Sequence, residues 1–327
     1  MSHVTYPEEG VRSTYPQEGV RTPEAAYRVG IDIGGTFTDG VVITSNGEMH
    51  IFKTLSTPAD SSIGMFDCLS RAAAKFGLRG LREFLGRVEL LVHGTTVATN
   101  TMLQYNGAKT GLITTKGFRD ALEMRRAHKE NIWDLSMAPP PPIIPRYLRL
   151  GVTERINYAG QVVTPLDEAE ARHIVGQLKT EGGVKAIAVC TLFSFINPVH
   201  ERRIREIILE EYPECYVSIS SDILPQVREY ERTSTTVVNA YVGPVLGRYL
   251  RNLQDKLAAA GLKHEVLITQ SNGGIMSASY GAEHGAATLL SGPSAGAVGG
   301  MFFAAQLGMP NLIVMDMGGT SCDVSLV

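Results

Sequence analysis

The stretch VGIDIGGTFTD at residues 29–39 decides the fold, and IVMDMGGTSCD at residues 313–323 repeats its pattern. In both stretches an apolar strand reaches an aspartate, a Gly-Gly-Thr turn follows one residue later, and a second aspartate begins another strand. Paired glycines allow a sharp turn whose backbone N–H groups can approach a phosphate, and threonine hydroxyls add further donors. We therefore predict two β-hairpins that bind one polyphosphate, rather than two ordinary glycine turns.

The residue types in the two turns indicate separate roles. An aspartate at a strand end suits Mg²⁺, which uses few carboxylates and keeps several waters. Asp32 and Asp316 are therefore the predicted metal-binding and catalytic residues, and Asp39 is a further catalytic candidate that shapes the turn or positions water. The predicted phosphate-binding residues belong to both turns: Gly34, Gly35, Thr36, Thr38, Gly318, Gly319, Thr320 and Asp323.

Motifs of other nucleotide-binding and hydrolytic sites do not fit this sequence. It contains neither GxxxxGK[ST] nor GxGxxG, so a P-loop and a dinucleotide fold are not indicated. Residues 292–296 (GPSAG) match the GxSxG pattern of serine hydrolases, which requires an acid and then a histidine after the serine. All eight histidines precede Ser294, and this order argues against a serine hydrolase.

Composition narrows the class of protein further. With 327 residues, 44% of them hydrophobic and 19% charged, the chain can bury the cores of about two domains. Thirty basic and 33 acidic side chains give a net charge of −3, which does not indicate a nucleic-acid partner. No apolar run is long enough to predict a membrane helix. Four scattered cysteines without a CxxC pair favour a reducing cytoplasm.

Strand and helix patterns alternate between the two turns. Apolar strand patterns and amphipathic helix patterns in alternation, with some hairpins, predict an α/β fold with a mixed sheet. The strand patterns include residues 88–92, 109–114 and 185–193, and the helix patterns include 60–76, 167–179 and 231–260, in which Gly243-Pro244 is a candidate break. Residues 1–26 contain a tandem repeat, TYPEEGVR and TYPQEGVR, and are predicted to form a flexible arm.

Residues 93–96 (HGTT) follow an apolar strand and begin a helix. Backbone N–H groups at the start of a helix bind anions readily, so we expect His93, Thr95 and Thr96 to contact the substrate. The alternative is that one threonine caps the helix and that His93 forms internal hydrogen bonds.

The two hairpins resemble the phosphate loops of the actin, Hsp70 and sugar-kinase superfamily, which has a ribonuclease H-like architecture. More specifically, residues 28–327 resemble the hydantoinase A/5-oxoprolinase family. The resemblance is carried by both glycine turns and by segments between them, namely HGTTVATN (93–100), GLITTKGFRD (111–120), SFINP (194–198), ERR (201–203), SNGG (271–274) and SGP (291–293).

This resemblance implies an ATP- and Mg²⁺-dependent subunit that phosphorylates the carbonyl oxygen of a cyclic amide such as a hydantoin or 5-oxoproline. A hydantoinase B-like subunit would complete ring opening in a hetero-oligomer. The resemblance also leaves open an ATP-using subunit of an acetone- or acetophenone-type carboxylase. A non-catalytic, actin-like nucleotide-binding protein is the third possibility.

The resemblance also implies a division of the chain. Residues 27–210 would form the N-terminal region with the first phosphate loop, and residues 211–327 would begin a core domain that reaches the second loop. Family chains continue beyond this second turn. We therefore expect an architecture that is incomplete at the C-terminus, and no activity from this stretch alone.

Overall fold

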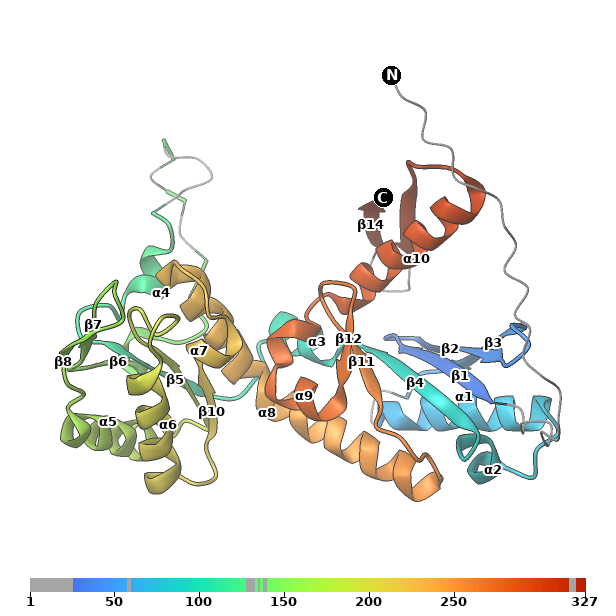
Figure 1. Cartoon of the computed structure of the whole chain (residues 1–327), viewed down its shortest axis with the longest axis horizontal. Coiled ribbons are helices and arrows are strands. Elements are labelled where there is room, and N and C mark those ends of the chain that lie inside the picture. The colour runs from blue at the N-terminus through green and yellow to red at the C-terminus, as the bar shows by residue number, and fades with distance from the viewer. Residues whose placement is uncertain (1–25, 58–59, 128–132, 135, 138–139, 318–321) are drawn as a thin grey trace, which may run out of the picture.

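The computed structural model describes residues 26–57, 60–127, 133–134, 136–137, 140–317 and 322–327. The tandem repeat of the predicted N-terminal arm lies outside these residues. Within them the chain forms two α/β units that lie side by side and are joined by one long helix (Figure 1). This confirms the predicted α/β class with a mixed sheet.

The first unit is built on a six-stranded mixed sheet that carries the first glycine turn. Its strand order is β12-β11-β4-β1-β2-β3, and β1 pairs antiparallel with β2 but parallel with β4. Alternate residues of β1, among them Val29 and Ile31, are buried toward α1 (Ser61–Lys75), as the period of a strand requires. The strands are β1 (Tyr27–Ile33), β2 (Phe37–Thr44), β3 (Met49–Leu55), β4 (Val88–Thr95), β11 (Leu267–Thr269) and β12 (Ile275–Ser277).

The second unit contains a four-stranded parallel sheet with the order β10-β9-β5-β6. Its two central strands, β5 and β9, are buried at every position, which explains their continuous runs of apolar and small residues. The larger elements of this unit are β5 (Thr110–Thr115), β6 (Arg149–Val152), α5 (Glu168–Thr180), β9 (Ala186–Cys190), α6 (Val199–Glu211) and β10 (Tyr216–Ile219). A separate small hairpin is formed by β7 (Arg155–Ile156) and β8 (Val162–Thr164).

Helix α8 (Glu229–Ala260) joins the two units and continues through Pro244 without a break. Val237 and Ala240 belong to the core of the second unit, whereas Leu246 and Leu250 belong to the core of the first. The helix ends at Gly261, whose φ of 117° is a left-handed conformation that glycine adopts without strain. One rigid element therefore sets the relative position of both sheets.

The sheets divide the chain differently from the predicted boundary at residue 210. Strands β11 and β12 return to the first sheet after the second unit is complete, so the first unit is discontinuous in sequence. Residue 210 lies in α6, and β10, which follows it, still pairs with β9 of the second sheet. The predicted division thus describes a sequence resemblance and does not separate the two sheets.

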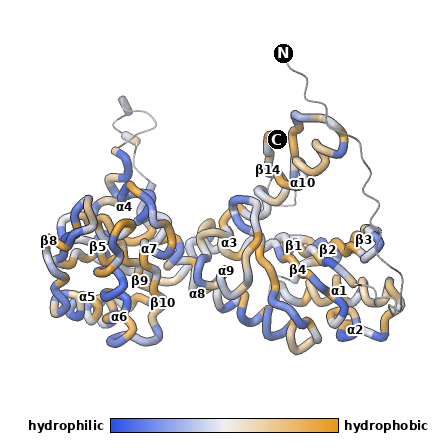
Figure 2. The backbone as a smooth tube through the Cα atoms, in the orientation of Figure 1, coloured by the Kyte–Doolittle hydropathy of each residue, from blue (hydrophilic) through white to orange (hydrophobic). Residues whose placement is uncertain are grey.

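The C-terminal segment consists of α10 (Ser291–Leu307) and a hairpin of β13 (Ile313–Met317) and β14 (Cys322–Leu326), and it rises beside the first sheet (Figure 1). Apolar residues gather in both sheets and also along this segment (Figure 2). Exposed apolar side chains include Phe302, Phe303 and Met315. The segment therefore presents apolar surface outside both cores.

Short helices complete the fold. They are α2 (Leu81–Leu85), α3 (Val97–Leu103), α4 (Ala121–Met124), α7 (Ser220–Ile223), α9 (Ala278–Glu283) and the 3₁₀ turns η1 (Arg146–Leu148) and η2 (Gly285–Thr288). Among the helices of the described residues, none has the length and apolarity that a bilayer span requires.

Candidate functional site

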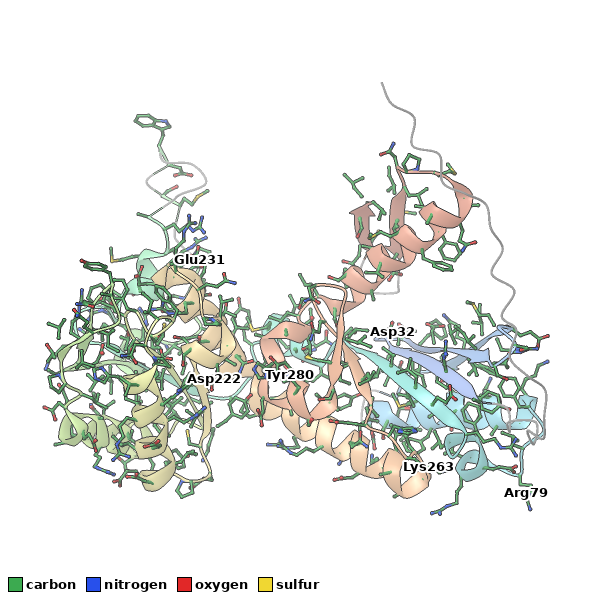
Figure 3. The ribbon with its side chains drawn as sticks, viewed as in Figure 1. Asp32, Arg79, Asp222, Glu231, Lys263 and Tyr280 are labelled. Atoms are coloured by element: carbon green, nitrogen blue, oxygen red, sulfur yellow. The ribbon has the colours of Figure 1, made fainter. Side chains whose placement is uncertain are left out.

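The first glycine turn forms the hairpin that the sequence predicts. The Gly34 N–H donates to the Phe37 carbonyl over 2.9 Å, which closes the turn between β1 and β2. The register pairs Asp32 with Asp39 across the two strands. Because directly opposed residues of an antiparallel pair lie on the same face, both carboxylates belong to one side of the sheet. Figure 3 shows Asp32 at the end of this sheet that lies toward the C-terminal segment.

The second glycine turn is flanked by the same strand pairing. The register of β13 and β14 places Asp316 opposite Asp323, as β1 and β2 place Asp32 opposite Asp39. The predicted phosphate-binding residues of this turn, Gly318, Gly319 and Thr320, lie outside the described residues, and their role stays a prediction.

The aspartates of the two hairpins influence one another. The pKa of the Asp32 carboxyl is raised, first by loss of hydration and then by the negative charges of Asp39 and Asp316. Asp316 therefore lies close enough to Asp32 for its negative charge to contribute to the raised pKa of Asp32, although the two residues are 284 positions apart in the sequence. The Nζ of Lys53 lies 2.7 Å from the Asp39 carboxylate. Among the aspartates Asp32, Asp39 and Asp316, Asp39 is the one that forms an ion pair within the described residues.

The acidic groups suit a magnesium ion that a nucleotide would share. Among the described residues no group of three or more histidine, cysteine or acidic side chains is arranged to hold a metal by itself. Mg²⁺ is commonly bound through one or two carboxylates together with waters and substrate phosphates. Asp32 and Asp316 fit this donor set, and a bound cation would offset the negative charges that add to the loss of hydration in raising the pKa of Asp32.

Gly94 on β4 gives the Asp32 carboxylate its space. The parallel register sets Gly94 directly beside Asp32. A Cβ atom at Gly94 would lie 2.6 Å from Oδ1 of Asp32, which is closer than van der Waals contact allows. The sequence analysis did not assign this role to Gly94, because it depends on the pairing of two strands that are distant in the chain.

Thr38 does not lie where the sequence analysis expected. Its side chain is fully buried, and its Oγ1 lies 3.0 Å from Oγ of Ser56. The strand period explains this position, because Thr38 pairs with buried Ile33 and faces α1. Ser56, which was not predicted, instead lies beside the turn and donates to the Gly34 carbonyl over 2.8 Å. Thr38 thus supports the turn through Ser56 in this structure.

A cleft of about 380 Å³ opens beside the first turn. Its walls come from the ends of β1 and β4, from α3 and from α8, so it lies at the carboxyl ends of the two parallel strands, where open α/β sheets commonly bind ligands. The lining residues are Ile33, Gly34, Gly35, Ser56, Thr57, Thr95, Thr96, Val97, Asn100, Thr101, Gln104, Asn106, Val245 and Tyr249.

The three predicted substrate residues have different positions in this region. Thr95 and Thr96 line the cleft, whereas the His93 ring is fully buried behind it. Burial lowers the pKa of His93 to about 4, so the ring is neutral at pH 7. Its Nδ1 lies 3.3 Å from the Ile31 carbonyl, which can only accept, so we assign the proton to Nδ1 and an acceptor role to Nε2, 2.8 Å from the Tyr249 hydroxyl. His93 therefore has the internal hydrogen bonds of the alternative interpretation.

Comparison with protein families decides which family this arrangement represents. The hydantoinase/oxoprolinase N-terminal region matches residues 28–212, and the hydantoinase/oxoprolinase family matches residues 232–327. The chain belongs to the hydantoinase/oxoprolinase family. This confirms the resemblance that the two glycine turns and the segments between them indicated.

Individual relatives are similar to most of this chain. The chain is 38% identical over 302 residues to the caprolactamase subunit alpha of Pseudomonas jessenii and 40% identical over 319 residues to the acetophenone carboxylase gamma subunit of Aromatoleum aromaticum. These matches cover 92% and 93% of this chain, but 43% of each relative. The chain therefore spans less than half the length of these relatives.

Two solved structures share the fold of this chain. An acetone carboxylase in nucleotide-free form superposes with a TM-score of 0.84 at 31% identity, covering 93% of this chain and 44% of that chain. The ATP-dependent caprolactamase of Pseudomonas jessenii superposes with a TM-score of 0.81 at 37% identity, covering 92% and 43%. The predicted actin/sugar-kinase-like fold is thereby confirmed.

The raised pKa of Asp32 predicts an effect on stability. Because this pKa is higher in the folded protein than in the unfolded chain, the ionised carboxylate lowers stability once the pH exceeds the folded value, and the cost disappears in acid. Asp32→Asn should therefore raise the melting temperature at pH 7 by about 1–2 °C, allowing for solvent screening. Calorimetry should show the difference shrinking as the pH falls. Asp255→Asn on the exposed surface of α8 is the control, and a lower melting temperature for Asp32→Asn alone would contradict the prediction.

Proposed function

We propose that this chain belongs to the ATP-dependent subunit of a cyclic amidase that opens lactam rings of the hydantoin, 5-oxoproline or caprolactam class. The observation that carries the proposal is that Asp32 and Asp316, each beside a Gly-Gly-Thr turn, lie within electrostatic reach of one another. The cleft, which Gly34 and Gly35 of the first turn line, provides room for a substrate beside that turn. Relatives described as ATP-dependent support the use of ATP.

The chain's own residues would act mainly by positioning. Asp32 and Asp316 would hold Mg²⁺ directly or through water, and the N–H groups of residues 34–36 and 318–320 would bind the phosphates. The bound ion would neutralise charge on the phosphates during transfer. Asp39, paired with Lys53, and Asp323 would fix the acidic face of each hairpin.

The cleft would hold the lactam so that its carbonyl oxygen faces the terminal phosphate. Phosphoryl transfer depends largely on alignment and charge neutralisation, so a site made of loops and a metal is sufficient. Thr95 and Thr96 would contact the ring, and the neutral His93 would hold the Tyr249 hydroxyl in place from behind. Phosphorylation converts the inert amide oxygen into a good leaving group.

We further propose a hydantoinase B-like partner subunit and a cytoplasmic location. Relatives named as alpha, beta and gamma subunits support a hetero-oligomer. The four cysteines are free thiols, and three of them, Cys68, Cys190 and Cys215, are buried, which suits a reducing compartment.

The test is ATP turnover by the protein purified from its host with any subunits that copurify. A cyclic amide should raise the rate of phosphate release at least about tenfold, because the substrate oxygen completes the site. Turnover that no cyclic amide stimulates would favour the non-catalytic, actin-like interpretation.

An ATP-using carboxylase subunit is the second candidate. The 40% identity to an acetophenone carboxylase subunit and the match to an acetone carboxylase structure favour it. The two candidates share the nucleotide site and differ in the carbonyl substrate. ATP cleavage that requires both a ketone and bicarbonate would identify the carboxylase.

A further inference from the structure

The wall of the cleft consists of uncharged groups. Hydroxyl groups come from the β3–α1 connection, the end of β4, α3 with its first flanking residue, and α8, and carboxamides come from α3 and the residues after it. The remaining described lining residues are glycine or aliphatic. The polar members are Ser56, Thr57, Thr95, Thr96, Thr101, Asn100, Gln104, Asn106 and Tyr249.

These polar groups match the hydrogen-bonding pattern of a neutral amide. The Asn106 amide donates to Oε1 of Gln104 over 3.0 Å, and the Asn100 amide donates to the Thr96 hydroxyl over 3.2 Å. Carboxamides and hydroxyls both donate and accept, so they can adapt to a substrate N–H and a substrate C=O at the same time.

None of the described residues that line the cleft carries a charge. Asp32 immediately precedes the lining residue Ile33 on β1, and the alternation of a strand directs these two side chains to opposite faces of the sheet. A carboxylate entering the cleft would therefore lose hydration without meeting a cationic side chain in the described wall.

We infer that the cleft accepts an uncharged cyclic amide and discriminates against a ring that carries a carboxylate. The inference rests on the proposed function, since the substrate must lie in this cleft to meet the phosphate. Specificity arises here in two ways: hydroxyls and carboxamides pair with a neutral ring, and the described wall offers no cation to compensate for the hydration that a carboxylate would lose.

A matched pair of substrates tests the inference. 2-Pyrrolidinone and 5-oxoproline have the same five-membered lactam ring, and 5-oxoproline adds a carboxylate. 5-Oxoprolinamide has nearly the same size as 5-oxoproline without the charge. For the protein purified with its copurifying subunits, kcat/KM for amide-stimulated ATP hydrolysis should be about 100-fold higher with either neutral ring than with 5-oxoproline.

A charge introduced into the wall provides the second arm. Gln104 is exposed at the end of α3 and lines the cleft, so Gln104→Lys should reduce the preference for neutral rings by about tenfold. Gln104→Met controls for the lost amide, and Gln177→Lys on α5 controls for added charge away from the cleft.

The outcomes separate this inference from the proposed function. A preference for neutral rings that Gln104→Lys weakens, and Gln177→Lys does not, supports the inference. Equal or faster turnover with 5-oxoproline overturns the inference but leaves a cyclic amidase. Stimulation by none of the three rings overturns the proposed function, and the inference with it.

Discussion

Replacing Asp32 by alanine is expected to abolish substrate-dependent ATP consumption, with a loss of about 1,000-fold or more in kcat. Asp32 is the proposed anchor of the metal, and Asp39, which lies opposite it in the first hairpin, is instead paired with Lys53. Phosphoryl transfer needs that charge at a fixed place, because neutralisation of the phosphates supplies much of the rate enhancement. The measurement is phosphate release with saturating cyclic amide.

The fold should survive this substitution. The Asp32 side chain is accessible to solvent, and its charge has an energetic cost in the folded state. Asp255→Ala, which removes a carboxylate from the exposed surface of α8, should retain full activity. An Asp32→Ala protein with the circular dichroism and the turnover of the wild type would show that Asp32 does not anchor the metal.

Gly94→Ala is expected to lower kcat/KM for ATP by about 100-fold although it adds a single methyl group. The new Cβ would lie 2.6 Å from Oδ1 of Asp32, so the carboxylate must move. A displacement of about 1 Å in a positioning group can cost this factor. Steady-state kinetics of the purified variant gives the value directly.

Gly30→Ala is the matched control for Gly94→Ala. Gly30 lies on β1 two residues before Asp32, and a Cβ there would meet nothing within 4 Å. Both changes add a methyl group to a strand of the same sheet, so a general effect on the sheet would appear in both variants. Equal activity in the two variants would contradict the role assigned to Gly94.

Local pattern was sufficient to predict the two hairpins. The repeated strand, aspartate and Gly-Gly-Thr order specifies turn chemistry that few other arrangements satisfy, and the structure pairs Asp32 with Asp39 and Asp316 with Asp323 in the same way. The long helix pattern was also visible in the sequence. Its continuity through Pro244 was not, because burial against both cores compensates for the hydrogen bond that proline removes.

Long-range pairing explains what the sequence did not reveal. The closeness of Gly94 to Asp32 follows from a parallel pair of strands, β1 and β4, whose register no local pattern specifies. The return of β11 to the first sheet likewise depends on contacts between distant segments. Thr38 was assigned to the phosphates by residue type, but the hairpin register buries it. The contact of Ser56 with the first turn was not predicted, because a single serine after a strand is common in sequences.

The central claim is that two glycine hairpins from opposite ends of the sequence hold one magnesium-bound polyphosphate. The most direct measurement is a structure of the protein, with its copurifying subunits, bound to Mg²⁺ and a non-hydrolysable ATP analogue. The account predicts the terminal phosphates between residues 34–36 and 318–320, with the ion next to Asp32 and Asp316. Phosphates that contact one hairpin alone, with the other turned away from the nucleotide, would contradict it.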